Sequence, residues 1–277
     1  MLNNFSISIR GIFTISVLTL KEALRKKFVL VIIFTSGIFL LLNFLCEPSS
    51  IKVNSNGEEK NVSSIGSYIV FILISFWSMA ISGLMTAGLI SDELENKNYI
   101  MVLSKPVSRL TYLLGKFFGV FFLVLCNAVI FLIIQNVLTI AKSGKFEINL
   151  WLSLFIMLLD FVLLISIVMF LTIQVNKIAG IFLSLALVVI TTLINIPIYD
   201  SSISQSLELA PTKKAILEIL YWVLPQFGTV FFQASTHVAK SVTQTHYLGY
   251  YSMIQVSVWI FIVWVFLSVL FEKKELD

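Results

Sequence analysis

Two long apolar runs separated by a charged segment constrain this chain most strongly. The runs cover residues 65–89 and 117–141, and each is long enough to cross a bilayer, for which about 20 residues suffice. The segment between them, residues 90–116, carries both acidic and basic side chains. We call it the connecting segment. It must join two membrane helices on one side of the membrane, where a soluble partner can reach it.

The composition of the whole chain is that of a polytopic membrane protein. Of the 277 residues 58% are hydrophobic and only 12% are charged, and 24 are Phe. Because the bilayer core offers no water to backbone polar groups, the long apolar segments of such a chain must form helices. We therefore predict an all-α membrane protein in one transmembrane domain, residues 1–277. The net charge of +4 gives no reason to expect a nucleic-acid partner.

Apolar runs of sufficient length predict six transmembrane helices, at residues 28–45, 65–89, 117–141, 150–173, 178–198 and 250–271. Residues 1–27 precede them as an amphipathic helix, with Arg10, Lys21 and Arg25 on one side and apolar residues on the other. That pattern suits the membrane surface. The alternative is that this helix is the extended foot of the first span.

Residues 199–249 form an external region before the last span. Part of this region is apolar enough to enter the membrane, but Glu218, Pro225 and Gly228 interrupt it. We predict a pair of short external or re-entrant helices, which are tolerated at membrane depth only where protein covers their backbone.

The distribution of basic residues predicts the orientation. With six spans, twelve of the 19 Lys and Arg residues fall on the side of the N-terminus, the connecting segment, Lys177 and the C-terminal tail, and seven fall on the other side. Cytoplasmic loops collect Lys and Arg. Both termini are therefore expected in the cytoplasm, with the chain in the plasma membrane.

The sequence lacks the motif that ATP hydrolysis requires. Gly83 and Gly88 have the glycine spacing of a phosphate-binding loop, but Leu89 and Ile90 follow in place of Lys and Ser or Thr. Cys46 and Cys126 have no metal-ligand spacing. We expect no catalytic site, cofactor or metal in this chain.

Asp160 is the exceptional residue within the predicted spans. It lies near the middle of the span at 150–173, where an ionised carboxylate costs at least about 2.5 kcal/mol and is usually functional. One hypothesis is a pathway or gating residue. The other is a packing carboxyl group hydrogen-bonded to Asn127, Gln135 or Asn136.

Two glycines at the start of the third span, Gly115 and Gly119, form a small-xxx-small pattern. Such a pair lets two helices approach closely. It suggests helix packing, with a dimer face as one use.

The connecting segment resembles that of the membrane subunits of type-2 ATP-binding-cassette transporters, in particular six-span bacterial permeases such as the nitrous-oxide-reductase maturation permease. The resemblance rests on three sequence stretches: Ser91-Asp92-Glu93-Leu94-Glu95, Val102-Leu103-Ser104-Lys105-Pro106-Val107-Ser108-Arg109 and Leu113-Leu114-Gly115-Lys116.

The resemblance implies that this segment is a coupling helix docked on a separate ATPase subunit, which binds ATP and magnesium. The residues implied in that contact are Asp92, Glu93, Glu95, Lys97, Lys105, Pro106 and Arg109. It further implies a permease in the bacterial inner membrane, working as a pair of membrane subunits and acting as an exporter, with periplasmic or accessory proteins as further partners.

Two other functions fit the residues. An ion-coupled secondary transporter would use Asp160 as its proton or cation site, although such transporters often carry internal repeats and we detect none. A membrane scaffold would anchor partners through the connecting segment and transport nothing.

Overall fold

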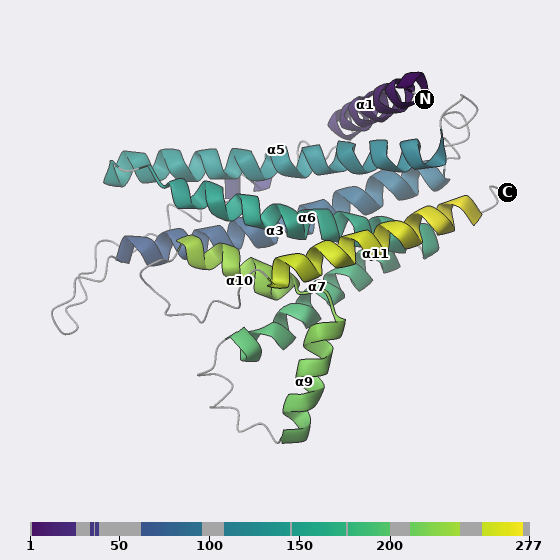
Figure 1. The fold of residues 1–277 in the computed structure, drawn as a ribbon. Helices are drawn as coiled ribbons and strands as arrows, with labels where there is room; N and C mark the ends of the chain where they lie inside the picture. The colour runs from purple at the N-terminus through teal and green to yellow at the C-terminus, as the bar shows by residue number, and fades with distance from the viewer. Residues whose placement is uncertain are drawn as a thin grey trace.

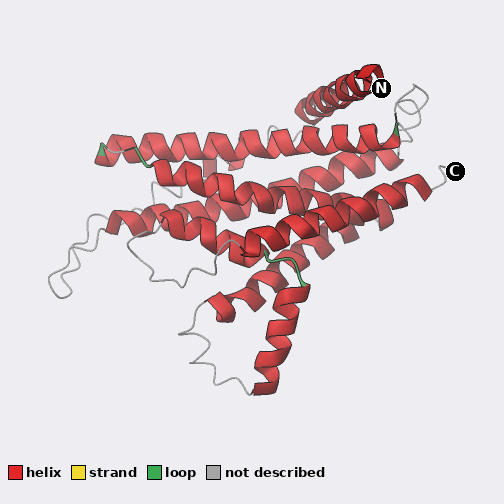
Figure 2. Cartoon of the chain, in the orientation of Figure 1, coloured by secondary structure: helices red, strands yellow, loops and turns green. Residues whose placement is uncertain are grey.

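The computed structural model describes residues 2–25, 34–35, 37–38, 62–95, 108–144, 146–175, 177–199, 211–238 and 251–273. Within these ranges the regular elements are all α-helices, with no strand (Figure 2). The all-α prediction is confirmed for this part of the chain. The chain forms helices because apolar segments in a bilayer must satisfy their backbone hydrogen-bonding groups internally.

Five of the described helices are long and apolar enough to cross a membrane. They are α3 (Val62–Glu95), α5 (Arg109–Ser143), α6 (Ile148–Gln174), α7 (Lys177–Tyr199) and α11 (Tyr251–Lys273). These five correspond to the last five predicted spans. The predicted span at residues 28–45 lies outside the described residues except for 34–35 and 37–38, so the count of six stays a prediction.

The helices on either side of the connecting segment are longer than the apolar runs that predicted them. Helix α3 continues to Glu95 and α5 begins at Arg109. The start of α5 is fixed by an N-cap, because the Ser108 hydroxyl oxygen accepts a hydrogen bond from the Thr111 backbone N–H at 3.2 Å. Both ends of the connecting segment are thus extensions of rigid helices.

Helix α6 forms the centre of the bundle, and α3, α5, α7, α10 (Phe227–Val238) and α11 pack around it (Figure 1). Its sequence is apolar on all sides, as expected of a helix that is mostly buried, although Ile148, Leu152 and Phe155 near its start are exposed. Its Ser153 and Ser166 hydroxyls donate to the carbonyls of Asn149 and Val162, at 2.8 and 2.7 Å. These hydroxyls are therefore satisfied without a partner on another helix.

The region before the last span contains two short helices, α9 (Pro211–Val223) and α10, with a break between them. Figure 1 shows α9 projecting away from the bundle, whereas α10 packs against α6, α7 and α3. Gln255 of α11 donates to the carbonyls of Trp222 and Leu224, at 2.7 and 3.2 Å. It thereby satisfies carbonyls at the end of α9 that lack a helical partner.

Helix α1 (Leu2–Arg25) packs along the first half of α5 at the two glycines. A Cβ atom on Gly115 would lie 2.6 Å from the Ile15 Cβ, and one on Gly119 would lie 2.6 Å from the Thr19 Cβ. Ile15 faces Gly115 and Thr19 faces Gly119, so the residue numbers of α1 and α5 increase together along the contact. The two helices therefore run in the same direction. The surface that we considered for a dimer is covered by α1 of the same chain.

The surface of α1 has three sectors rather than the two of the predicted amphipathic helix. Ile15, Thr19 and Ala23 are buried. Beside them are exposed apolar residues, among them Phe13, and beyond these is an exposed basic strip that includes Lys21. The exposed apolar and basic sectors keep the pattern of a helix at a membrane surface.

We predict that Gly119→Ala weakens the packing of α1 on α5. The added methyl group would meet the Thr19 Cβ at 2.6 Å, and overpacking of this kind typically costs about 1–3 kcal/mol. Thermal unfolding of the detergent-purified protein measures the effect. The control is Gly83→Ala in α3, where a Cβ meets nothing within 4 Å. Equal melting temperatures for the two variants would contradict the α1–α5 contact.

Candidate functional site

The candidate site is the end of the bundle where the connecting segment leaves α3 and enters α5. Three polar contacts tie these helix ends to α11, α7 and α1. We call this set of contacts the junction; its residues are Glu22, Asp92, Arg109, Tyr112, Lys116, Lys177 and Phe271.

The first contact joins the start of α5 to the end of α11. Arg109 Nη1 donates to the Phe271 carbonyl oxygen at 3.2 Å, and a cation beside the last carbonyls of a helix is favourable. Tyr112 lies nearly parallel to the Phe271 ring, with centroids 6.0 Å apart and an interplanar angle of 11°. The guanidinium that the resemblance assigns to the ATPase contact is therefore used within the chain.

The second contact joins the end of α3 to the start of α7. Lys177 Nζ donates to Asp92 Oδ1 at 2.8 Å, and both side chains are about one-third exposed. Asp92 belongs to the acidic stretch Ser91–Glu95, one of the three stretches on which the resemblance rests. The structure thus places its carboxylate at the start of α7.

The third contact joins α5 to α1 and is the most buried of the three. Lys116 is only 5% exposed, and its Nζ lies 3.3 Å from Glu22 Oε2. A buried ammonium group is costly unless it is paired. Glu22 is the only acidic residue in the sequence of α1, so this one carboxylate gives the helix a fixed position along α5.

The junction is closely packed. The void beside Lys116 has a volume of only about 10 Å³ and is lined by residues of α3, α5, α6 and α11. That space holds at most about one water molecule. The ends of four helices therefore meet here without room for a ligand.

Of the residues implied in ATPase contact, only Asp92 and Arg109 have described side chains. Glu93 and Glu95 lie in the last turn of α3, but their side chains are outside the described part of the chain. Lys97, Lys105 and Pro106 lie outside the described residues altogether. Their contact with an ATPase stays a prediction.

Asp160 and Asn127 lie in the core, away from the junction. Asp160 on α6 is 0% exposed and Asn127 on α5 is 2% exposed. Among the described residues, neither Asp160 carboxylate oxygen has a hydrogen-bond partner, and neither amide atom of Asn127 has one. The hydrogen bonds from Asp160 that the packing hypothesis requires are absent from this part of the chain.

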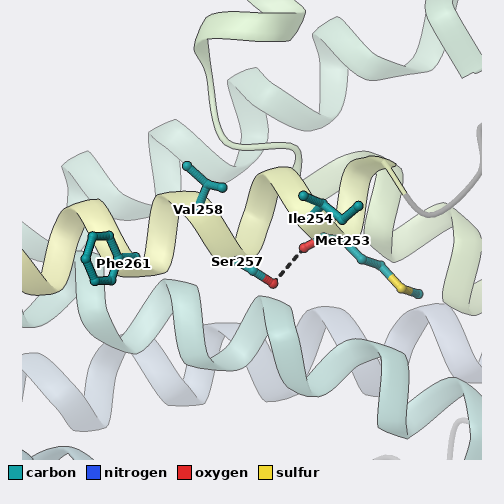
Figure 3. Close-up of a pocket in the computed structure, with 5 residues that line it drawn as sticks. All are labelled: Met253, Ile254, Ser257, Val258 and Phe261. Atoms are coloured by element: carbon teal, nitrogen blue, oxygen red, sulfur yellow. Dashed lines mark hydrogen bonds between the residues drawn. The ribbon is translucent and has the colours of Figure 1, made fainter.

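An apolar groove of about 540 Å³ runs along α11. Figure 3 shows its lining of Met253, Ile254, Val258 and Phe261, with Ser257 as the one hydroxyl. That hydroxyl donates to the Met253 carbonyl of the same helix at 2.8 Å. Because the only hydroxyl in the lining already donates within its own helix and the other lining residues are apolar, the groove fits a surface that faces lipid chains.

Sequence reasoning did not single out Glu22, Lys177 or Phe271. Glu22 carried a signal, because it is a lone acidic residue in a helix whose other charges are basic. Lys177 appeared only in the count of basic residues, and Phe271 is one aromatic residue among many. Their roles depend on which helix ends meet.

The class of membrane protein follows from a match to a known protein family. The sequence matches the model of the ABC-2 family transporter protein over residues 45–271. This chain belongs to the ABC-2 transporter family. No curated protein matches it.

Membership of the ABC-2 family makes the chain a multi-pass membrane protein and a transport subunit. The family implies an ABC ATPase as a partner and typically a dimeric assembly. The family match includes the connecting segment and the junction residues of α3, α5, α7 and α11, whereas α1 precedes the matched residues.

We predict that Glu22→Gln destabilises the fold, because it removes the carboxylate that Lys116 contacts in a buried site. Breaking a fully buried ion pair costs about 3–5 kcal/mol; Glu22 is 31% exposed, so we expect a smaller loss, of order 2 kcal/mol. Thermal unfolding in detergent measures it.

Two further variants make this prediction specific. Lys21→Gln removes an exposed charge from the neighbouring position of α1 and should leave the melting temperature unchanged. Adding Lys116→Met to Glu22→Gln should recover stability, because no buried charge remains. Equal effects of Glu22→Gln and Lys21→Gln would show that the ion pair does not stabilise the protein.

Proposed function

We propose that this chain is the membrane-spanning permease subunit of an ATP-binding-cassette transporter, which forms the pathway and couples to a separate ATPase through the connecting segment. The observation that carries the proposal is the junction. The segment that would receive the ATPase movement is attached at both ends to helices whose polar contacts reach α1, α7 and α11.

Mechanical coupling follows from this arrangement. A chain with no phosphate-binding loop can use the energy of ATP only through a partner that hydrolyses it. Packed helices respond to a displaced neighbour by shifting as rigid bodies. A partner that closes on the connecting segment would move the ends of α3 and α5, and the junction would pass that movement to the other helices.

The finer parts of the proposal extend the family assignment. We propose six spans, with residues 28–45 as the first, both termini in the cytoplasm and the bacterial inner membrane as the location; the excess of Lys and Arg on that side supports this orientation. We further propose, on the basis of the resemblance, that the chain forms a homodimer with two ATPase subunits and that it exports its cargo. The narrower similarity to the nitrous-oxide-reductase maturation permease is part of the same proposal.

Affinity purification of the intact protein in mild detergent tests the coupling. An ATPase should co-purify with the native chain and should be lost with the double variant Glu93→Lys and Lys105→Glu, which reverses two charges of the connecting segment and leaves the described junction contacts in place. The control is Lys52→Glu with Glu58→Lys, in the loop predicted on the opposite side. Absence of an ATPase from the native sample would overturn the proposal.

The burial of Asp160 favours a second candidate, an ion-coupled secondary transporter. A fully buried carboxyl group with no hydrogen-bond partner among the described residues is costly in the state that the structure shows, and such residues usually mark a pathway or an ion site. Within the permease proposal, the same observation supports a role for Asp160 as a pathway residue that finds polar partners in another conformation.

We predict that Asp160→Asn preserves the fold and the co-purifying ATPase but impairs transport. The substitution keeps the shape of the side chain and removes the group that is costly to bury, so the melting temperature should not fall. Reconstituted vesicles supplied with either ATP or a proton gradient distinguish the two candidates. Transport driven by the gradient alone, and abolished by Asp160→Asn, would favour the secondary transporter.

A further inference from the structure

The ion pair between Asp92 and Lys177 occupies an unusual position relative to the two helices that carry it. Asp92 lies in the last turns of α3, and Lys177 is the first residue of α7. An acidic group near a helix C-terminus and a basic group at an N-terminus each oppose the helix dipole. Each charge is unfavourable at its own helix end, so the ion pair between α3 and α7 accounts for the presence of Asp92 and Lys177 at these positions.

The contact is short and open to solvent. Lys177 Nζ lies 2.8 Å from Asp92 Oδ1, with exposed side-chain fractions of 38% and 32%. Pairs of this kind add little to stability. An exposed pair can therefore form and break within a transport cycle. The buried pair of Lys116 with Glu22 opens less readily, because breaking it leaves a charge buried without a partner.

Helix α7 is in close contact with the central helix directly after this ion pair. A Cβ atom on Gly180 would lie 3.1 Å from the Thr172 Oγ1 of α6 and 3.3 Å from the Thr172 backbone N. The two helices follow one another in the chain and pack closely at this point. A displacement of Lys177 would therefore be transmitted to α6 as well as α7.

We propose that Asp92 and Lys177 are positioning residues that carry movement of the connecting segment to the α6–α7 hairpin. Asp92 then acts on Lys177 within the chain. The resemblance alone would instead assign Asp92 to the contact with the ATPase. The inference rests on the proposed function, because it needs an ATPase to move the segment.

Charge reversal separates the two roles of Asp92. The variants are Asp92→Lys, Lys177→Asp and the double exchange, each studied in the full complex in vesicles. The readouts are the co-purifying ATPase and the labelling rate of a reporter cysteine, Leu193→Cys, at an exposed position of α7, with and without ATP and vanadate. Each variant carries Cys126→Ser and Cys46→Ser so that only the reporter reacts.

We expect ATP to change the reporter's labelling rate in the native background. Each single reversal should reduce that change at least about fivefold, the lower end of typical coupling between sites. The ATPase should remain bound, and the double exchange should restore the response. Glu218→Lys, an exposed reversal on α9, should have no effect.

Several results would overturn the inference. If Asp92→Lys releases the ATPase and the double exchange fails to restore it, Asp92 contacts the ATPase. If the single reversals leave the ATP response intact, or if the native reporter does not respond while the ATPase is bound, the ion pair does not drive α7. If no ATPase binds the native chain, the proposed function itself fails.

Discussion

The close contact between α1 and α5 at Gly115 and Gly119 is the interaction on which the rest of the structure depends. Between helices in a membrane there is no strong hydrophobic driving force, so close approach and polar contacts must hold them together. The two glycines bring Ile15 and Thr19 against the α5 backbone, and Ser16 donates to the Gly115 carbonyl at 2.9 Å. Lys116 lies between the glycines and pairs with Glu22.

That contact makes the first turns of α5 the meeting point of the bundle. Arg109 and Tyr112 hold the end of α11 on the turns before the glycines, while Asp92 ties the end of α3 to α7. The buried contact on α1 and the exposed contact on α7 differ in kind: the first fixes a helix in place and the second can open. A moving connecting segment would therefore carry α1 with it and act on α7 through a contact that can break.

The sequence predicts the helices well because the bilayer leaves few alternatives to a long apolar helix. It also predicts the break near Pro225, where the structure has a gap between α9 and α10. It does not show which surfaces meet. The glycine pair indicated close packing, but its partner could have been a second copy, and only the structure shows α1 there.

The junction was less predictable for the same reason. Charges in the connecting segment indicated a soluble partner, yet three of them, Asp92, Arg109 and Lys116, have partners inside the chain. Those partners come from helix ends far away in the sequence, and one is a backbone carbonyl that has no sequence signal. Asp160 could be recognised from its apolar surroundings alone, whereas its lack of a hydrogen-bond partner among the described residues required the packed core.

Site-specific photo-crosslinking in the native membrane tests the central claim most directly. A photoreactive residue at position 105 should form an adduct with an ATPase subunit, and the same residue at position 52, predicted on the opposite side, should form none. An adduct at position 52 with none at position 105, or no ATPase adduct at either position, would contradict the account of a permease driven through its connecting segment.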